Sequence, residues 1–496
     1  MTVSAVVDLL AEAGRLSSGP DAAQLMDWYA RRPHGRGSDV EAVLQLRSES
    51  GRRSQLVLSA ADEMPSLRNI WPAAIWPQRE AVERIGVRFT GDPTPTPLWT
   101  AAVRAAHDEE DGADDGAESD GYLVLPDPGV ATPWRLDLRV RLQHRVIEAA
   151  QAIPGKTHSD FEALATRHGY AQLPQLAEGL NEQAPFAVGL AAILAAEELL
   201  GVTTSSRCQR VRMILAEVSR IGAHCAWLTA QAGSDGALRG QALEAREAAA
   251  RLLVDASGSR WATGVLRVGG VEADATTNSQ ALLTALANAV EDLCAAARRQ
   301  LIDDADWRRR FAGLAAIDDS TARLWAITGP ALRATGTAVD VRRDAPYLEY
   351  SEVDFDVPVA SDGDVADRVA VRLAEMPQSL GICRQCLSDL PAGPSRPGAL
   401  TTPMEAAELI DHFELWMDGH GHRPHPGTVY RPTESADGEL AFWLAADGTG
   451  KPAAVHLRSP SLYHFQLLEH LLPGTEWDQA PGVVASMNIV APEMDR

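Results

Sequence analysis

The chain has 496 residues, of which 45% are hydrophobic and 23% charged, and its formal net charge is −23. This length exceeds what one hydrophobic core usually supports, so we expect two or three domains in a soluble, acidic protein. Nucleic acid is not an expected partner, because phosphate binding requires clustered Lys and Arg.

The sequence also bears on where the protein works. Asp8 interrupts the N-terminal apolar stretch and no basic run precedes it, which argues against a secretory signal and favours a cytoplasmic start. The most apolar stretch, residues 185–196, is followed by Glu197 and Glu198 and is shorter than the roughly 18 residues that a membrane span needs. Five cysteines in a chain of this length indicate a reduced compartment rather than a disulfide framework.

Residues 1–106 are expected to form a small α+β domain. Helix-like spacing of apolar residues in 22–31 is followed by strand-like alternation in 41–47 and 54–59. Residues 107–121 then combine carboxylates with Gly and Ser and contain almost no apolar side chains. We therefore expect an extended acidic linker there.

Residues 122–496 are expected to form a larger, mainly helical module, so the predicted fold class is α+β. Alternation in 134–146 indicates a half-buried strand or hairpin. Apolar residues recur at helical spacing in 211–228 and again in 282–293, which predicts a helical bundle. Short peripheral strands are expected later in this module, at residues 427–430, 439–444 and 453–458.

The cysteines are the first candidates for metal chemistry. Cys383 and Cys386 have the spacing of half a metal or iron–sulfur site, because two thiolates so placed can hold one ion. No second such pair exists, and Cys208, Cys225 and Cys294 occur singly within helical patterns. Buried structural thiols are the alternative interpretation.

Histidines give weaker candidates. His420, His422 and His425 could chelate a metal, but the Gly and Pro content of their segment is typical of a surface loop. His224 lies beside an apolar helical stripe and is either a proton carrier or a hydrogen-bonded core histidine.

Nucleotide-binding motifs are missing. Residues 447–452 resemble a phosphate-binding loop only superficially, since the motif needs an earlier Gly and a Ser or Thr after the Lys. No dinucleotide fingerprint occurs, so this chain is not expected to bind a nicotinamide cofactor itself.

Residues 65–93 resemble the signature of the 30-kDa-type subunit of respiratory complex I. In that signature a Trp precedes Arg-Glu, followed by an acidic residue, a Gly-hydrophobic pair and Arg-Phe. The matching residues are Trp76, Arg79, Glu80, Glu83, Gly86, Val87, Arg88 and Phe89.

Most of residues 129–496 resembles the 49-kDa-type subunit of complex I, which shares its fold with the large subunit of nickel–iron hydrogenases. The resemblance implies a hydrogenase large-subunit-like fold for the larger module. It also implies a fusion of the two subunit types, as in some bacterial complex I and formate hydrogenlyase-type subunits. The matching stretches are AEELLGV (196–202), ILAEVSRIGAH (214–224), RVGGV (267–271), DVRRDAPY (340–347), residues 355–380, PMEA (403–406), HF (412–413), PTESADGEL (432–440) and Asp495–Arg496.

The same resemblance identifies missing metal ligands. Active hydrogenases hold nickel and iron with four thiolates from an early and a late CxxC motif, because soft sulfur ligands suit these metals. Here the early motif falls on residues 158–164, which contain no Cys, and Val490 and Glu493 stand at the late thiolate positions. We expect no nickel and no cofactor bound by this chain, with a 4Fe–4S cluster in a partner subunit.

The usual quinone ligands are also replaced. Gly129 and Pro133 stand where the family has two histidines in its first hairpin loop, and Glu182 stands where the family has its quinone-facing Tyr. The acidic partner of the quinone histidine falls on Ser234 or Asp235. Loss of His and Tyr removes the usual proton donors to a reduced quinone, so quinone remains only one candidate ligand.

Other polar residues keep the identities that the family has, which implies that an interior polar network survives. We take Glu182, His224 and Arg267 as the candidate catalytic residues, on a path that would carry protons. The residues with retained identities are His224, Arg267, Asp356, Asp364, Asp367 and Arg368.

Two functions are consistent with these features. The first is a peripheral-arm subunit of a complex I-like or formate hydrogenlyase-related oxidoreductase complex, in which electron transfer is coupled to proton movement. Its partners would be an iron–sulfur small subunit and membrane proton-pumping, antiporter-like subunits, on the cytoplasmic side of the plasma membrane. The second is a structural scaffold subunit of such a complex, without redox chemistry. Classical quinone reduction and active hydrogenase chemistry rank below both.

Overall fold

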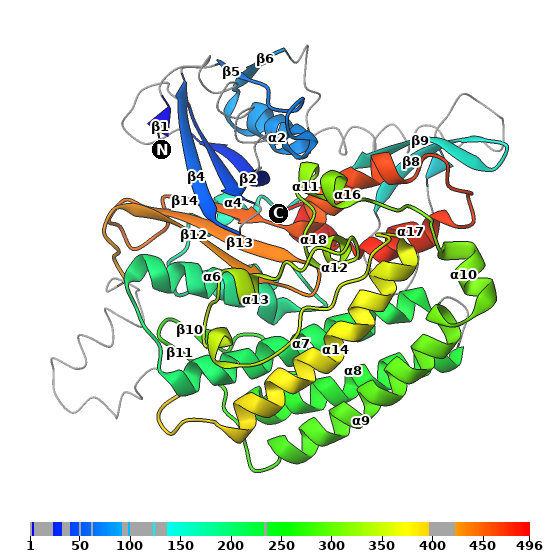
Figure 1. Ribbon diagram of the computed structural model, residues 1–496. Coiled ribbons are helices and arrows are strands. Elements are labelled where there is room, and N and C mark those ends of the chain that lie inside the picture. Colours follow the sequence, from blue (N-terminus) through cyan, green and yellow to red (C-terminus); the bar gives the residue numbers. More distant parts are fainter. Residues whose placement is uncertain are drawn as a thin grey trace, which may run out of the picture.

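The structure is a computed structural model and describes residues 2–3, 23–31, 40–48, 51–60, 63–91, 98–99, 123–124, 136–232, 236–395 and 422–496. The chain has a mixed α+β fold, which confirms the predicted class (Figure 1). The larger sheets lie in the upper part of that view and a bundle of long helices lies below them.

The first sheet lies within residues 2–60. Strands β3 (Val40–Arg47) and β4 (Arg53–Ala60) pair antiparallel in continuous register, which confirms both predicted strands. Strand β2 (Gln24–Arg31) pairs antiparallel with the other edge of β3, and β1 (Thr2–Val3) runs parallel to β4. The strand order is therefore β1-β4-β3-β2.

The prediction of a helix at residues 22–31 is wrong, because Gln24–Arg31 form strand β2. Trp28 and Tyr29 in this strand are buried, and aromatic residues favour strands whose faces are covered. Pairing along nearly the whole of β3, with one bulge, satisfies the backbone and outweighs the local helix-like spacing.

A short helical segment packs on this sheet. The 3₁₀-helix η1 (Pro72–Ala74) leads into α2 (Ile75–Ile85), which contacts β2. Helix α2 ends at Gly86, whose φ of 69° lies in the left-handed region that glycine adopts at little cost. Strands β5 (Glu63–Pro65) and β6 (Arg88–Thr90) flank this helical segment in the chain and pair in parallel.

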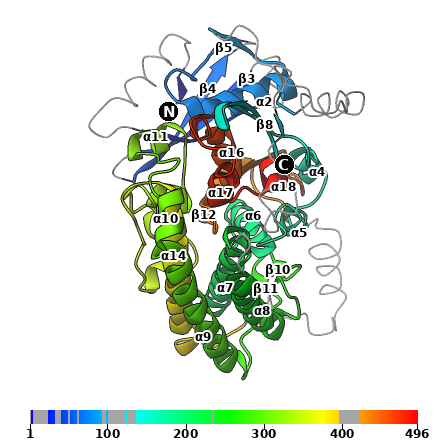
Figure 2. The same cartoon turned by 90° about the vertical axis from the view of Figure 1, so that its right-hand side faces the viewer.

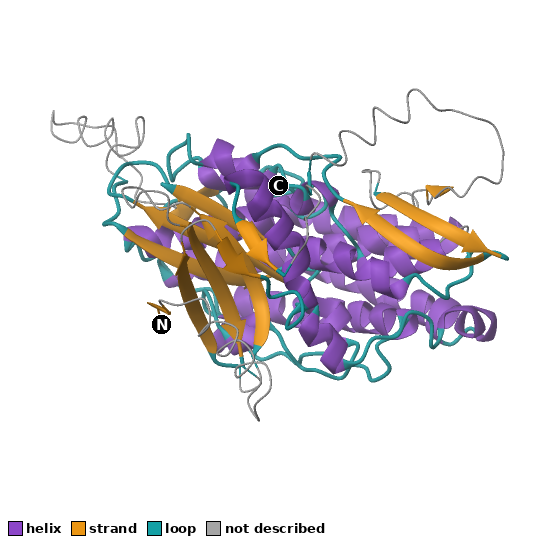
Figure 3. Ribbon diagram, turned by 90° about the horizontal axis from the view of Figure 1, so that it is seen from above, coloured by secondary structure: helices purple, strands orange, loops and turns teal. Residues whose placement is uncertain are grey.

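The hairpin predicted near residues 134–146 is confirmed. Strands β8 (Asp137–Gln143) and β9 (Val146–Ile153) pair antiparallel, and β7 (Leu123–Val124) pairs with β8. Figure 3 shows this hairpin at one end of the molecule, away from the other sheets.

The helical bundle is also confirmed. Helices α7 (Ser206–Gln231), α8 (Gly236–Ser257), α9 (Ser279–Ala297) and α14 (Val365–Ser388) pack together, with α7 contacting α8 and α14, and α9 contacting the same two helices (Figure 2). The apolar residues that predicted α7 and α9 lie in the buried core of this bundle or pack against it.

The predicted C-terminal strands form one antiparallel sheet with the order β12-β13-β14, built from β12 (Gly427–Glu434), β13 (Glu439–Ala446) and β14 (Ala454–Arg458). Alternate residues of β13 face opposite sides. Phe442 and Leu444 pack into the core beside α6 (Pro185–Leu200), whereas Trp443 and Ala445 pack against the N-terminal sheet. Because both faces are covered, the sequence of β13 is a continuous apolar run.

Short elements complete the fold. They are α4 (Phe161–Ala165), α5 (Leu173–Glu178), β10 (Leu266–Arg267), β11 (Gly270–Val271), the π-helix η2 (Arg298–Ile302), α10 (Ala305–Phe311), α11 (Asp319–Leu324), α12 (Gly329–Arg333), α13 (Val341–Asp344), η3 (Tyr350–Glu352), α16 (Pro460–Leu471), α17 (Ala480–Met487) and α18 (Ala491–Met494). Among the described residues, no helix is both long enough and apolar enough to cross a membrane.

The N-terminal region and the larger module share one hydrophobic core. Trp28, Leu44 and Trp76 belong to the same buried cluster as Phe465 and Met487. The rings of Trp76 and Phe465 lie edge to face with centroids 5.8 Å apart. The two regions therefore pack as one unit in the part of the chain that the structure describes.

Candidate functional site

A cavity of about 590 Å³ opens where α5 ends and α6 begins. Helices α7 and α8 and residues 261–263 provide its other walls. Small-molecule sites are usually concave and place a few polar groups among apolar and aromatic side chains. Its charged, polar and aromatic lining residues include Glu178, Glu182, Gln183, Thr229, Arg246 and Trp261.

Glu182, a predicted catalytic residue, lies on the wall of this cavity. Its side chain is exposed and belongs to the turn between α5 and α6. Asn181 holds this turn, because its Oδ1 accepts hydrogen bonds from the backbone N–H groups of Gln183 (3.0 Å) and Ala184 (2.9 Å). The turn thus places Glu182 at the cavity.

Glu178 is a second carboxyl group in the cavity lining, and the sequence analysis did not single it out. It is only 7% exposed, and its Oε2 accepts a hydrogen bond of 2.8 Å from the backbone N–H of Gly264. Burial raises the pKa of Glu178 to about 7, against the opposing effects of Gly264 and Arg267. The sequence signal for it is a second carboxylate four residues before Glu182.

Arg267, another predicted catalytic residue, lies beside the cavity rather than in its lining. It ends β10, and its Nη1 donates hydrogen bonds of 2.9 Å to the carbonyl oxygens of Gly264 and Leu266. Arg267 therefore fixes the Gly264 turn that binds Glu178, and its positive charge favours the ionised form of Glu178. Its role in this geometry is positioning.

Arg246 on α8 brings a positive charge to the cavity. Its guanidinium carbon lies 4.8 Å from the centroid of the Trp261 ring, in a cation–π arrangement. Burial lowers the pKa of Arg246. No sequence pattern indicates this pair, because the two residues lie on different elements.

His224, the third predicted catalytic residue, does not line the cavity. Helix α7 presents Ala226 and Thr229 to the cavity and directs the fully buried His224 elsewhere, as residues two positions apart on a helix face different ways. His224 Nε2 lies 3.1 Å from Oε2 of Glu375 on α14. Burial lowers the pKa of His224 more than Glu375 raises it, so the neutral ring donates from Nε2.

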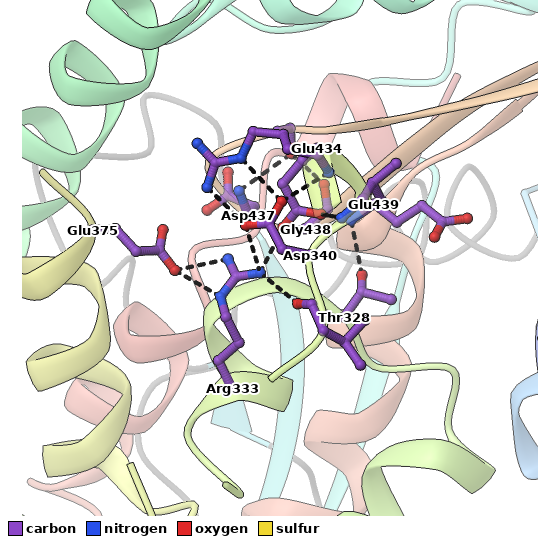
Figure 4. Close-up of polar contacts among 12 residues, drawn as sticks. Thr328, Arg333, Asp340, Glu375, Glu434, Asp437, Gly438 and Glu439 are labelled. Atoms are coloured by element: carbon purple, nitrogen blue, oxygen red, sulfur yellow. Dashed lines mark hydrogen bonds and ion pairs between the residues drawn. The ribbon is translucent and has the colours of Figure 1, made fainter. Parts of the chain in front are cut away.

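Glu375, which binds His224, also belongs to a buried network of charges centred on Arg333. Figure 4 shows Glu375, Asp340 and Glu434 around Arg333. Arg333 Nη2 lies 2.7 Å from Glu375 Oε1, and Arg333 Nη1 lies 2.8 Å from Glu434 Oε1 and 3.6 Å from Asp340 Oδ2. Burial alone would raise the pKa of Glu375, but Arg333 and His224 lower it below its usual range. The neutral His224 therefore donates to a carboxylate that the buried network keeps ionised.

A second buried arginine extends this network. Arg342 binds Asp340 (2.7 Å) and Glu217 (3.0 Å), and Glu217 also accepts hydrogen bonds of 2.6 Å from Tyr350 and Ser379. Charged pairs at this depth are stable only when each partner is matched, so this cluster ties α7, α13 and α14 together. Among the described residues, no group of three or more His, Cys, Asp or Glu could hold a metal ion.

Two stretches of the chain match known protein families. Residues 4–107 match the family described as the 30-kDa subunit of respiratory-chain NADH dehydrogenase. Residues 238–496 match the family described as the 49-kDa subunit of the same enzyme. The chain belongs to the complex I 49-kDa subunit family. It carries a 30-kDa-type region in the same polypeptide.

Individual relatives agree with this assignment, and three of them are D-type subunits of NADH-quinone oxidoreductase. The chain is 34% identical over 366 residues to one such subunit of Roseiflexus sp., an alignment that covers 71% of this chain and 87% of that protein. The D-type subunit of Geotalea uraniireducens is 32% identical over 73% of this chain and 95% of its own length. That of Parvibaculum lavamentivorans is 34% identical over 73% of this chain and 94% of its own length.

In this complex I 49-kDa family member, residues 155–162 lie against the C-terminal residues 495–496. Asp495 Oδ1 accepts a hydrogen bond of 2.8 Å from the N–H of Gly155, and Arg496 Nε lies 2.8 Å from Glu162 Oε1. Glu493 accepts hydrogen bonds from Ser459 (2.7 Å) and other polar side chains. Burial raises the pKa of Glu493 to about 7.

The cysteines that the sequence singled out as possible metal ligands are buried within a helix of this family member. Cys383 and Cys386 are buried on α14, and burial raises the pKa of both thiols, that of Cys386 to about 11. Thiols so protected from ionisation are poor metal ligands.

His422 and His425 precede β12 in an irregular segment, and residues 447–452 form the turn between β13 and β14.

Asp364, Asp367 and Arg368 stabilise the start of α14. Asp364 caps α14, because its Oδ1 accepts a hydrogen bond of 2.8 Å from the N–H of Asp367, and Arg368 donates to the carbonyl oxygen of Gly363 at 2.7 Å. The N–H of Asp356 donates to Gln378 at 2.9 Å. The remaining predicted features, namely Gly129, Pro133, Ser234, Asp235, His420 and the linker 107–121, lie outside the described residues.

Proposed function

We propose that this chain is the peripheral-arm subunit of a membrane-bound respiratory complex, either complex I-like or related to formate hydrogenlyase. It would pack beside an iron–sulfur subunit that carries a 4Fe–4S cluster, bind no nickel, and contact membrane antiporter-like subunits. Those partners would hold it at the cytoplasmic side of the plasma membrane. Its role would be electron transfer coupled to proton movement.

The cavity beside α5 and α6 is the observation that carries this proposal. It joins a buried carboxyl, an exposed carboxyl and a guanidinium stacked on an aromatic ring. Side chains of these types can bind a small polar molecule and exchange protons with it, even though the family's usual quinone ligands are replaced. The cavity thus supports a reaction with an electron acceptor that is bound differently from the family's usual quinone.

A scaffold function without redox chemistry is the second candidate. The full burial of His224 favours it, because a neutral histidine that donates to the internal carboxylate Glu375 contributes to packing. Under this alternative the cavity would bind no reacting molecule, and the chain would only hold the neighbouring subunits together.

The test begins with the tagged chain, extracted from native membranes in mild detergent. We expect the extracted complex to contain iron in the amount that 4Fe–4S clusters require and to contain no nickel. We also expect antiporter-like subunits to co-purify with the chain. A metal-free monomer in the soluble fraction would contradict the proposed complex.

Two variants then separate coupling from scaffolding. If the proposed path operates, Glu182→Gln and His224→Ala should each abolish the activity of the complex while assembly persists. Full activity in both assembled variants would favour the scaffold function.

A further inference from the structure

Arg246 brings a positive charge to the cavity and has no counter-ion there. Within the part of the chain that the structure describes, its guanidinium stacks on Trp261 and forms no hydrogen bond or ion pair. Nε is buried, whereas the unpartnered Nη1 and Nη2 keep a surface that is open to a bound molecule. Burial lowers the pKa of Arg246, Cys225 opposes this effect and Arg260 adds to it, so no carboxylate balances the charge.

Two buried arginines of the neighbouring helix α7 differ from Arg246 in this respect. Arg210 Nε lies 2.5 Å from Glu349 Oε2, and Arg212 Nη2 lies 2.7 Å from Glu197 Oε1. A guanidinium that leaves bulk water loses hydration, and an anion that accepts its hydrogen bonds restores that loss. Arg246 has given up part of its hydration without such a partner, so it is a ready site for an anion from outside the chain.

A fixed turn places Trp261 beside Arg246. Oγ of Ser259 accepts hydrogen bonds from the N–H groups of Trp261 (3.4 Å) and Thr263 (3.2 Å). Ala262, which lies between them, is fully buried with a φ of 50°, a left-handed conformation that residues with a side chain seldom adopt. The turn thus fixes one side of the guanidinium and leaves its terminal nitrogens to donate in the fork geometry that matches a carboxylate.

The cavity also has apolar surface. Leu243 lies three positions before Arg246 on α8, so the two side chains share one face of the helix. Leu243 lines the cavity and is 49% exposed, and Pro185 and Ala226 line it as well. A ligand with an apolar body would cover this surface and gain free energy from its burial.

Glu182 limits the charge that the cavity accepts. Its exposed carboxylate forms no hydrogen bond or ion pair with the described residues. Among the lining residues that the structure describes, Arg246 is the only Lys, Arg or His, whereas Glu178 and Glu182 are both acidic. A phosphate dianion or a dicarboxylate would bring a second negative charge close to Glu182. A monocarboxylate carries one charge, which Arg246 neutralises.

We propose that this cavity binds a monocarboxylic acid with an apolar body, whose carboxylate accepts hydrogen bonds from Nη1 and Nη2 of Arg246. The guanidinium supplies the charge and the fork of donors, and Leu243 and Pro185 supply surface for the apolar body. The inference rests on the proposed function for the use of the ligand and adds the chemical class of that ligand.

Calorimetric titration of the purified full chain with hexanoate tests the binding. Because the formal charge of the chain is −23, saturable binding of an anion requires a local cation. Hexan-1-ol has the same apolar body without the charge, and adipate has a second carboxylate. Both should bind about tenfold more weakly than hexanoate, or worse. No saturable binding of hexanoate, or equal binding of hexan-1-ol, would overturn the proposal.

Variants of Arg246 locate the site. Arg246→Gln should weaken hexanoate binding by roughly ten- to hundredfold, the usual loss when a charged hydrogen-bond donor is removed. Arg246→Lys should bind with intermediate affinity, because it keeps the charge and loses the fork. Arg251→Gln is the matched control, since Arg251 lies on α8, pairs with Glu247 at 3.6 Å and does not line the cavity. Wild-type affinity in Arg246→Gln would overturn the proposal.

A further variant tests the charge limit. Glu182→Gln removes the negative charge opposite the ligand, so the difference in affinity between hexanoate and adipate should become smaller. An unchanged difference would overturn the assignment of this limit to Glu182. Because these titrations need neither partner subunits nor turnover, they decide the ligand class by themselves. A native complex without proton-coupled turnover would instead contradict the proposed function and leave the binding result intact.

Discussion

His456 on β14 binds Asp27 on β2 across the junction between the N-terminal sheet and the larger module, with Nε2 3.1 Å from Oδ2. The other ring nitrogen lies 3.0 Å from Glu162. Burial alone would lower the pKa of His456, but the two carboxylates raise it to about 9. The ring is thus a buried cation at neutral pH.

A pH dependence of stability follows from this cation. Because the folded-state pKa lies above the ordinary value of 6.5, the stabilisation is fully present below pH 6.5 and is lost as the pH rises through about 9. We expect His456→Gln to lower the free energy of unfolding at pH 7 by about 3–5 kcal/mol, since it removes the cation that pairs with the buried Asp27, whereas Glu162 keeps its ion pair with Arg496. Urea denaturation between pH 6.5 and 9 measures it, with the exposed His425→Gln as the control. An unchanged pH slope in His456→Gln would contradict this origin of the effect.

Gly189→Ala should destabilise the protein, although Gly to Ala within a helix usually stabilises it by roughly 0.5–1 kcal/mol. The new methyl group would meet Glu178, and such overpacking costs about 1–3 kcal/mol. In a Glu178→Ala background the same substitution should cost much less, because the clashing atoms are gone. A double-mutant cycle by urea denaturation measures this coupling. Additive effects of the two substitutions would show that Glu178 does not occupy the space beside Gly189.

Arg333→Leu should be among the most damaging single substitutions. It would leave Glu375, Glu434 and Asp340 buried without their shared cation, at a cost of about 3–5 kcal/mol in the free energy of unfolding. Arg309→Leu is the matched control, because Arg309 pairs with Asp306 at the surface and should contribute at most about 1 kcal/mol. Denaturant melts of both variants give the comparison, and similar costs would argue against a closed interior network.

Glu493→Gln should change the pH profile in the acid range. The pKa of Glu493 in the folded protein, about 7, lies above its ordinary value of 4.5, so its contribution to stability falls as the pH rises from 4.5 to 7. The variant should lose this slope and gain on the order of 3 kcal/mol relative to wild type at pH 8, with little change at pH 4. Glu244→Gln, the same substitution at an exposed position, is the control. A wild-type slope in Glu493→Gln would show that Glu493 titrates normally.

Periodicity in the sequence predicted part of the regular structure, including α7 and α9 of the bundle but not α8 or α14. The stripes of α7 and α9 and the alternation of β3, β4 and the C-terminal strands are local signals, and the structure confirms them. Strand β2 escaped prediction because its conformation is decided by pairing with β3.

The candidate site was only partly visible in the sequence. The resemblance led to Glu182, which does line the cavity, and to Arg267, which lies beside it. It could not show that His224 lies outside the cavity, because α7 carries both His224 and residues that line the cavity. Only the side of the helix on which each residue lies distinguishes them. Glu178 needed the structure, because its burial depends on Gly189 and Gly264, which lie on other segments.

The core shared by the two regions has a consequence for synthesis. Trp76 packs on Phe465, and Arg496 pairs with Glu80 at 3.0 Å, so contacts of the first hundred residues close over separations of roughly four hundred positions. Because the N-terminus is synthesised first, the N-terminal sheet keeps part of its apolar surface uncovered until the C-terminal residues have been made. During that interval the nascent chain is a client for chaperones that shield exposed strands.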